Sequence, residues 1–414
     1  MPFFPLHEGA LHAESVPLES VAARFGTPCF VYSRAAIEAA YRAFTDALAG
    51  RDHLVCYALK ANPNLAVVGL LARLGAGFDI VSGGELARVT AAGGDPAKVV
   101  FSGVGKSEAE IRHALAAGIL CFNVESASEL ARIERIAATA GVRAPVSLRV
   151  NPDVDPKTHP YIATGLKETK FGVAFEDALP LYRQAAASRS LEVVGMDFHI
   201  GSQITEVAPF ADALEKGLEL VGALEGRGIR LRHIDLGGGL GIRYRDEHPP
   251  SVAGYLRPML AQLAGRSEKI LLEPGRALVG NAGVLLARVE YLKHGAERNF
   301  AVVDAAMNDL LRPALYDAWH DIVPVAPRSG ATRRYEVVGP VCESGDFLGH
   351  ARDLVLEEGD LVAVRSAGAY GMSMSSNYNT RPRAAEVMVD GASMHLVRRR
   401  EPIDALFALE QRLP

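Results

Sequence analysis

The chain has 414 residues, more than one ordinary hydrophobic core accommodates, so we expect two domains. Hydrophobic residues make up 49% and charged residues 22%, a globular balance, and no apolar stretch is long enough to span a bilayer. The formal net charge of −5, without a long basic run, argues against nucleic acid or an anionic membrane as the main partner.

The first eight residues lack the basic segment followed by an apolar segment that is typical of a secretory signal. Four cysteines (Cys29, Cys56, Cys121 and Cys342) are spread over the chain, without a Cys-x-x-Cys pair and without the spacing of zinc ligands. We therefore expect free thiols, a cytoplasmic location and no bound metal.

Short apolar runs alternate with segments of helical periodicity between residues 54 and 275. Eight of these runs are expected to be strands: 54–59, 77–81, 99–103, 120–124, 146–150, 193–200, 232–236 and 269–273. Eight strands separated by helices predict an α/β fold, a parallel (β/α)8 barrel of the TIM type, which we place at residues 33–278. An open doubly wound sheet is the rival fold, but eight repeats favour closure.

From about residue 280 the pattern changes to strands without long helices between them, at 283–289, 334–341 and 360–364. This pattern predicts a second domain, a mainly antiparallel β-barrel or sandwich. Another apolar run at residues 27–32 could join it. We therefore assign residues 1–32 and 279–414 to the second domain.

Catalytic groups of such a barrel lie at the C-terminal ends of its strands. Those positions carry polar and glycine residues that we expect to form one site: Lys60, Asp79, Arg149, His199, Ser202, Gly238, Gly239, Glu273, Gly275 and Arg276. Lys60 closes the first strand, where a buried amine tends toward the uncharged form that carbonyl chemistry requires. The alternative is a lysine that leaves the strand and extends to solvent.

The glycines after the seventh strand, together with Gly275, can present backbone N–H groups to an anion, and Ser202 can add a hydroxyl. A phosphate site beside a lysine that forms a Schiff base points to pyridoxal 5′-phosphate (PLP). The alternative for the glycines is a tight turn of the barrel.

Three further side chains fit PLP. Glu273 would lie at the pyridine nitrogen, His199 against the ring and Arg149 at the phenolic oxygen. The alternatives are a buried ion pair for Glu273, a core position for His199 and a structural ion pair for Arg149.

These residues resemble those of PLP enzymes with the alanine-racemase-like barrel, and among them the diaminopimelate decarboxylases. The resemblance covers essentially the whole chain and rests on seven blocks, at residues 57–62, 78–85, 199–203, 273–276, 311–316, 342–346 and 368–373. The first four blocks are shared broadly with decarboxylases of ornithine and arginine, whereas the last three are more specific.

The resemblance implies decarboxylation of meso-2,6-diaminopimelate to L-lysine and CO2, the last step of lysine biosynthesis, by a homodimer whose active site is shared between subunits. Lys60 would bind PLP covalently, and Cys342 from the other subunit would donate a proton. The phosphate would be held by Ser202, Gly239, Gly275, Arg276 and Tyr370. The substrate would contact Arg276, Arg312, Tyr316, Glu343 and Tyr370.

The charges agree with this substrate. Arg312 and Arg276 suit bidentate recognition of a second carboxylate, and Glu343 suits the distal ammonium. The thiol of Cys342 can serve as a neutral proton donor. The alternatives are a surface ion pair for Arg312 and a small buried hydrophobe for Cys342.

Other functions stay open. The chain could be another PLP decarboxylase of this fold, acting on ornithine, arginine or carboxynorspermidine, or an amino-acid racemase, or a non-catalytic PLP-binding regulatory protein. A racemase is expected to place an arginine, not Glu273, at the pyridine nitrogen. Intact Lys60 and Cys342 argue against a non-catalytic protein.

Overall fold

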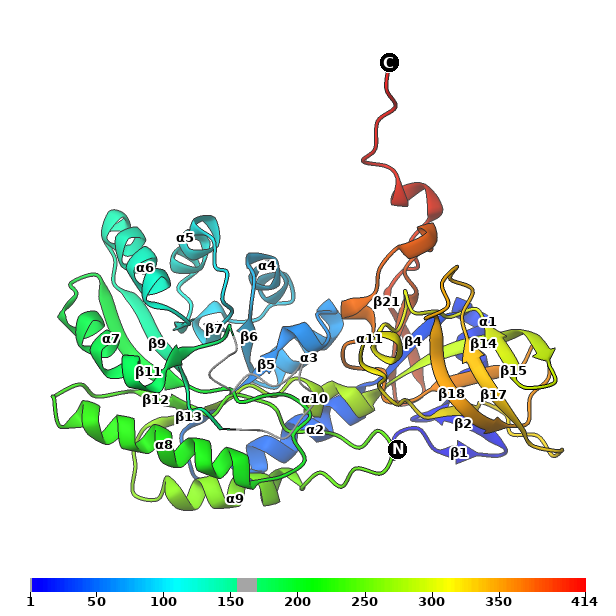
Figure 1. The fold of residues 1–414 in the computed structure, drawn as a ribbon, viewed down its shortest axis with the longest axis horizontal. Helices are drawn as coiled ribbons and strands as arrows, with labels where there is room; N and C mark the ends of the chain where they lie inside the picture. The colour runs from blue at the N-terminus through cyan, green and yellow to red at the C-terminus, as the bar shows by residue number, and fades with distance from the viewer. Residues whose placement is uncertain (1, 155–169) are drawn as a thin grey trace. The chain divides into compact units, whose positions relative to one another are not determined.

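The structure is a computed structural model that describes residues 2–154 and 170–414. The chain divides into two compact units (Figure 1). The barrel unit comprises Tyr41–Ile242 and His248–Ala277, and the sheet unit comprises Met1–Ala40, Arg243–Glu247 and Leu278–Pro414.

The barrel unit contains the closed ring of eight parallel strands that the sequence predicts. The order around the ring is β9-β11-β12-β13-β5-β6-β7-β8, and β8 pairs with β9 to complete it. The strands are β5 (His53–Ala58), β6 (Gly77–Ile80), β7 (Val99–Phe101), β8 (Cys121–Val124), β9 (Ala144–Asn151), β11 (Leu191–Asp197), β12 (His233–Asp235) and β13 (Lys269–Leu272). A short strand, β10 (Val173–Ala174), adds to β9.

Helix α2 (Arg34–Ala47) leads from β4 of the sheet unit into β5. The helices that connect the barrel strands are α3 (Leu65–Arg73), α4 (Gly83–Ala91), α5 (Glu108–Ala117), α6 (Ala127–Ala140), α7 (Phe175–Ala187), α8 (Ala208–Glu225) and α9 (Val252–Gln262). Ser82, Ser107 and Ser126 cap α4, α5 and α6, and each hydroxyl accepts a backbone N–H of the first turn. These caps start the helices soon after the strands end, which keeps the loops short. In the described parts of the chain, no helix has the length and apolar character needed to cross a membrane.

The barrel interior is apolar at its centre and polar at one end. Cys56, Cys121 and Leu271 belong to one buried cluster, although they come from strands that are not all neighbours in the sheet, so they meet inside the ring. Side chains alternate along a strand, so Asn123 and Glu273, two residues further on, also face the interior. The interior side chains at the carboxyl ends of the strands are therefore polar, and they meet at one end of the ring.

The sheet unit is mainly antiparallel, as predicted, with two parallel pairings, β4–β20 and β15–β17. The strand order is β18-β17-β15-β14-β4-β20-β21, and β19 pairs with both β14 and β16. These strands are β4 (Cys29–Ser33), β14 (Gly283–His294), β15 (Asn299–Val303), β16 (Ile322–Pro324), β17 (Arg333–Val338), β18 (Phe347–Leu354), β19 (Leu361–Val364), β20 (Ala385–Asp390) and β21 (Ser393–Arg398).

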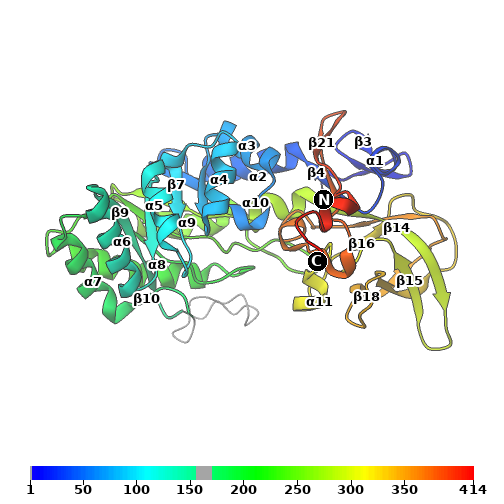
Figure 2. The same cartoon turned by 90° about the horizontal axis from the view of Figure 1, so that it is seen from above.

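The N-terminal strand β4 is an inner strand of this sheet, hydrogen-bonded to β14 and β20. Figure 2 labels β4 near β21, the strand that follows β20 in the sheet. Val31, Val284 and Val387 from the three strands share one buried core. Smaller elements complete the unit: a three-stranded sheet of β1 (Leu6–His7), β2 (Ala10–Ala13) and β3 (Val16–Pro17), with helices α1 (Leu18–Phe25) and α11 (Arg312–Tyr316). Helix α10 (Arg276–Val279) spans the boundary between the two units in the sequence.

Candidate active site

Lys60 and Asp79 form an ion pair at the carboxyl ends of two neighbouring barrel strands. Strand β5 ends at Ala58, and Lys60 follows in a single 3-10 turn rather than on the strand itself. Its Nζ lies 2.8 Å from Oδ2 of Asp79, and the side chains are 39% and 0% exposed, respectively. The expectation of a buried amine was therefore wrong, because the Lys60 side chain is partly exposed and contacts a fully buried carboxylate.

Glu273 lies in a buried group of acids. Oε1 of Glu273 accepts hydrogen bonds from Asn123 Nδ2 at 3.2 Å and from the Ser102 hydroxyl at 3.5 Å. Carboxylate oxygens of Asp197, Asp235 and Glu273 all lie within 4.8 Å of one another. Burial, followed by the neighbouring acids, raises the pKa of Glu273 well above its usual range.

Asp235 shares this environment. Burial raises the pKa of Asp235 from 3.8 to about 7, although its Oδ1 accepts the Gly237 N–H at 2.9 Å. Burial also raises the pKa of Asp197. The three acids therefore retain protons near neutral pH. A protonated pyridine nitrogen of PLP beside Glu273 would favour the ionised form of that carboxylate.

His199 follows strand β11 and is held by the glycine turn. Its Nδ1 accepts the Gly238 N–H at 3.1 Å, which places the ring proton of the neutral imidazole on Nε2. Burial, with help from the positive charges of Arg149 and Lys60, holds the pKa of His199 well below its usual range. The ring is therefore neutral and fixed in orientation.

Arg149 forms the structural ion pair that was the alternative to a ligand contact. Its Nη1 lies 3.1 Å from Oε1 of Glu125, and its Nη2 donates to the His199 carbonyl at 3.4 Å. Glu125 also accepts the backbone N–H groups of Gly103 and Gly172, at 3.0 and 2.9 Å. The ion pair fixes Arg149 beside His199, where the guanidinium can also meet a ligand.

The glycine turn after β12 has a packing reason of its own. A Cβ on Gly238 would lie 2.2 Å from the Glu273 carbonyl oxygen, and one on Gly239 would lie 2.4 Å from that of Gly201. Gly239 also has a positive φ of 114°. Close approach of neighbouring loops therefore requires glycine here, so the tight-turn interpretation holds for these residues whether or not they also bind an anion.

Hydrogen-bond donors nevertheless converge beside this turn. The N–H groups of Gly239 and Gly275 have no acceptor in residues 2–154 and 170–414. Arg276 Nη2 donates to the Ser202 hydroxyl at 3.2 Å, and Arg276 is almost fully buried. The barrel unit thus joins a lysine, a buried acid, a neutral imidazole and anion-binding groups on one set of strand ends.

Arg312 and Tyr316 lie in the sheet unit, at the two ends of helix α11. Arg312 is buried rather than a surface ion pair: its Nη1 donates to Nε2 of His320 at 2.8 Å, and its guanidinium lies 4.6 Å from the Tyr244 ring centroid. Tyr370, in the same unit, has a left-handed backbone with φ 57°. A tyrosine rarely adopts this conformation unless its surroundings enforce it.

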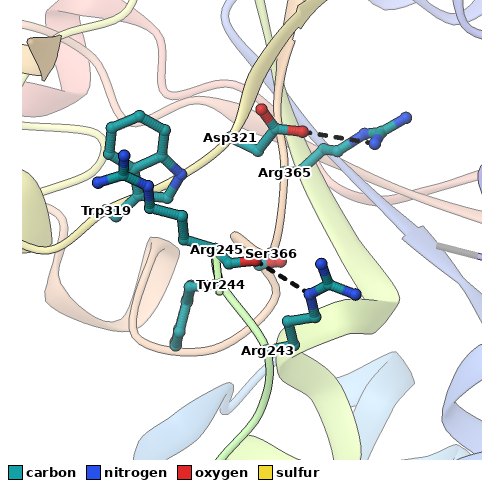
Figure 3. Close-up of a pocket in the computed structure, with 7 residues that line it drawn as sticks. All are labelled: Arg243, Tyr244, Arg245, Trp319, Asp321, Arg365 and Ser366. Atoms are coloured by element: carbon teal, nitrogen blue, oxygen red, sulfur yellow. Dashed lines mark hydrogen bonds and ion pairs between the residues drawn. The ribbon is translucent and has the colours of Figure 1, made fainter. Parts of the chain in front are cut away.

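Tyr244 also lines a cavity of about 420 Å³ in the sheet unit (Figure 3). Figure 3 shows Arg245 over the Trp319 ring, at 4.2 Å from its centroid, and Arg365 paired with Asp321 at 3.4 Å. The lining residues are Arg243, Tyr244, Arg245, Trp319, Asp321, Arg365 and Ser366.

Cys342 and Glu343 lie on an exposed loop, so Cys342 is not a buried hydrophobe in this chain. The Cys342 N–H donates to Asn379 Oδ1 at 2.8 Å. Buried Asp346 anchors the same loop by accepting the N–H groups of Met307 and Val341, at 2.7 and 2.8 Å. Cys29, Cys56 and Cys121 are free and buried, in agreement with the thiols expected from the sequence.

Sequence reasoning missed several residues that shape the site. Asp197 and Asp235 are the last residues of β11 and β12, and the pairing of β11 with β12 and of β12 with β13 brings them to Glu273. His320 and Asn379 belong to no motif that the sequence analysis used. Their contacts, with Arg312 and Arg365 for His320 and with the Cys342 N–H for Asn379, appear only in the folded chain. A polar residue at the end of an apolar run is the one available signal, and it applies to the two aspartates alone.

Comparison with known proteins identifies the family of the chain. The family model described as the pyridoxal-dependent decarboxylase, pyridoxal binding domain, matches residues 34–280. The diaminopimelate decarboxylase of Pseudomonas aeruginosa is 63% identical over 414 residues, which are 100% of both chains. The crystal structure of diaminopimelate decarboxylase from Helicobacter pylori, complexed with L-lysine, is 43% identical with a TM-score of 0.92 and covers 95% of this chain and 99% of its own.

A further solved structure, that of diaminopimelate decarboxylase from M. jannaschii in co-complex with L-lysine, is 37% identical. Its TM-score is 0.94, and the match covers 99% of this chain and 98% of that one. Lysine/ornithine decarboxylase from Vibrio vulnificus, at 24% identity and a TM-score of 0.80, shares the fold. The chain belongs to the diaminopimelate decarboxylase family of pyridoxal-dependent decarboxylases.

Proposed function

We propose that this protein is a PLP-dependent decarboxylase that converts meso-2,6-diaminopimelate to L-lysine and CO2. The observation that carries the proposal is the Lys60–Asp79 pair at the carboxyl ends of the barrel strands, in a chain whose relatives over its full length are diaminopimelate decarboxylases. Two of the solved relatives are complexes with L-lysine, which is the product of this reaction.

The residues of the barrel unit fit PLP. Two backbone N–H groups, of Gly239 and Gly275, have no acceptor in the described residues and suit the phosphate together with the Ser202 hydroxyl and Arg276. Buried Asp79 has an Oδ1 atom that accepts no hydrogen bond from the described part of the chain, so it can receive another donor. Gly238 belongs to the glycine turn that also contains Gly239, and we assign it to cofactor binding as well.

Each remaining side chain of the barrel has a role that follows from its charge. Lys60 would hold the cofactor covalently through its amine, and Glu273 would hold a proton at the ring nitrogen. His199, neutral and fixed by Gly238, would pack against the ring, and Arg149 would contact the phenolic oxygen. When bound, PLP supplies a sink for the electron pair that is released as the α-carboxylate leaves as CO2.

Five residues are assigned to the substrate. We assign Arg312 and Arg276 to the distal carboxylate, Glu343 to the distal ammonium, and Tyr316 and Tyr370 to further contacts. The remaining group, Cys342, donates the proton that replaces CO2 on the α-carbon, and its thiolate then regains a proton from solvent.

The exposed position of Cys342 supports a donor that reaches a neighbouring subunit, so we propose a homodimer with shared sites. The PLP-binding barrel at residues 33–278, the second domain formed by residues 1–32 and 279–414, and the cytoplasmic location stay predictions.

Two measurements test this function. Borohydride reduction of the holoenzyme followed by peptide mapping should place the cofactor on Lys60, and a label on another lysine would overturn that assignment. Release of CO2 from meso-2,6-diaminopimelate should exceed release from ornithine or arginine under identical conditions. Faster turnover of ornithine or arginine would instead assign the protein to the polyamine-forming decarboxylases.

A further inference from the structure

We propose that His320 is a positioning residue for Arg312 and thereby sets specificity for the distal carboxylate of the substrate. The proposal rests on the proposed function, because it gives Arg312 the carboxylate to bind. His320 lies between helix α11 and strand β16 and is fully buried, with 0% exposure. Each ring nitrogen of this buried histidine has a polar partner, so the residue makes specific polar contacts and does not merely fill apolar space.

Both ring nitrogens of His320 are used, and their partners fix the tautomer. Nδ1 lies 2.8 Å from the Arg365 carbonyl oxygen, which can only accept, so Nδ1 carries the hydrogen. Nε2 lies 2.8 Å from Nη1 of Arg312, which can only donate, so Nε2 is the acceptor. His320 is therefore a neutral imidazole that orients one N–H of the guanidinium.

A neutral acceptor matters for function. A carboxylate at this position would pair with the guanidinium and reduce its attraction for a ligand, whereas the imidazole orients the group without adding a negative charge. The contact with His320 therefore leaves the positive charge of Arg312 available to a carboxylate.

Tyr244 restrains the Arg312 guanidinium in a second direction. The guanidinium carbon of Arg312 lies 4.6 Å from the Tyr244 ring centroid, and the same ring meets the His320 ring edge-on, with centroids 5.2 Å apart and planes at 76°. A cation stacked on an aromatic face is attracted to it. Tyr244 thus limits tilting of the guanidinium while His320 limits its rotation.

The backbone around His320 is also restrained. Arg352 Nη2 donates to the His320 carbonyl at 2.8 Å, and the Arg352 guanidinium stacks on Trp319 at 3.1 Å from the ring centroid. Figure 3 shows the two flanking side chains, Trp319 and Asp321, in the wall of the cavity, with Tyr244 in the same wall. His320 is therefore held by its neighbours, and its ring is a rigid support for Arg312.

Two amide variants separate the two ring contacts. In His320→Gln the amide reaches the position of Nε2 and its oxygen can still accept from Arg312. In His320→Asn the amide reaches only the position of Nδ1, so the contact with Arg365 can persist while the contact with Arg312 is lost. The two substitutions remove the same imidazole, so each controls for the other.

The test measures KM and kcat for meso-2,6-diaminopimelate on holoenzymes with equal PLP absorbance and equal melting temperature. We expect His320→Asn to raise KM by roughly 10- to 100-fold with little change in kcat, and His320→Gln to stay within a few-fold of the native enzyme. In an Arg312→Ala background, His320→Asn should add nothing further, because its effect passes through Arg312.

Equal KM values for the native enzyme and His320→Asn, or an additive double variant, would overturn the positioning role. Absence of CO2 release by the native enzyme would instead overturn the proposed function itself. If His320→Asn does not fold, Tyr244 gives the second measurement. Tyr244→Leu should raise KM and Tyr244→Phe should not, and equal values for the two would again overturn the proposal.

Discussion

Replacing Asp235 with asparagine tests whether the barrel keeps its buried acids protonated. The carboxyl accepts the Gly237 N–H at 2.9 Å, and carboxylate oxygens of Asp235 and Glu273 lie within 4.8 Å of one another. The amide oxygen of asparagine can keep the bond from Gly237, and its NH2 group can donate to Glu273. The substitution therefore copies the protonated aspartate at every pH.

The magnitude follows from the pKa of Asp235, which is raised from 3.8 to about 7 in the folded protein. Below pH 3.8, Asp235 is protonated in both the folded and the unfolded protein, so its burial costs no folding free energy through ionisation. Above pH 3.8 the unfolded protein loses this proton, and the free-energy cost of folding grows until the folded carboxyl ionises near pH 7. At 1.36 kcal/mol per unit, the cost is below about 1 kcal/mol at pH 4 and reaches roughly 4 kcal/mol at pH 8. Asp235→Asn should remove it.

The assay is the melting temperature of the barrel transition in PLP-free protein between pH 4 and pH 8. We expect Asp235→Asn to match the native protein at pH 4 and to exceed it at pH 8 by on the order of 10 °C. Asp212, an exposed residue of helix α8, provides the control, and Asp212→Asn should show no such pH dependence. A gain that is the same at both pH values, or no gain at pH 8, would refute the reasoning.

Three further predictions concern turnover. Lys60→Ala should abolish turnover, and a Lys60→Ala enzyme that keeps native kcat would remove this lysine from the mechanism. The variant Cys342→Ala should slow product formation by roughly 10²–10⁴-fold. Mixing it with Lys60→Ala should restore activity in hybrid dimers. If subunit exchange is proven and no activity returns, the shared site is contradicted. Finally, Arg312→Ala should reduce kcat/KM by roughly one to two decades and Arg312→Lys should recover only part of it, because a point charge cannot replace the planar fork. Full recovery with lysine would argue against bidentate binding.

The sequence was sufficient for the fold because each barrel strand is an apolar run that ends in polar or glycine residues. The run before Asp235, for example, predicts a buried strand without reference to any partner. The sequence also predicted the N-terminal strand of the second domain, since residues 27–32 form an isolated apolar run.

The chemistry of the site was harder to predict because it depends on distances. Lys60 was expected to be buried and uncharged, but strand β5 ends two residues before it and Asp79 lies within reach. The acid group at Glu273 arises from the pairing of β11, β12 and β13, and His320 contacts Arg312 across the loop that follows helix α11. The catalytic and binding roles assigned to single residues stay predictions until the variants are measured.

The place of strand β4 has a consequence for how the chain folds as it leaves the ribosome. Its hydrogen-bonding partners β14 and β20 begin at Gly283 and Ala385, whereas β4 ends at Ser33. At a synthesis rate of roughly 5–20 residues per second, β4 waits on the order of tens of seconds for either partner. The barrel can close in that interval, while an apolar strand with two unpaired edges remains exposed. Slowing translation after the barrel should therefore increase the recruitment of chaperones to the nascent N-terminus.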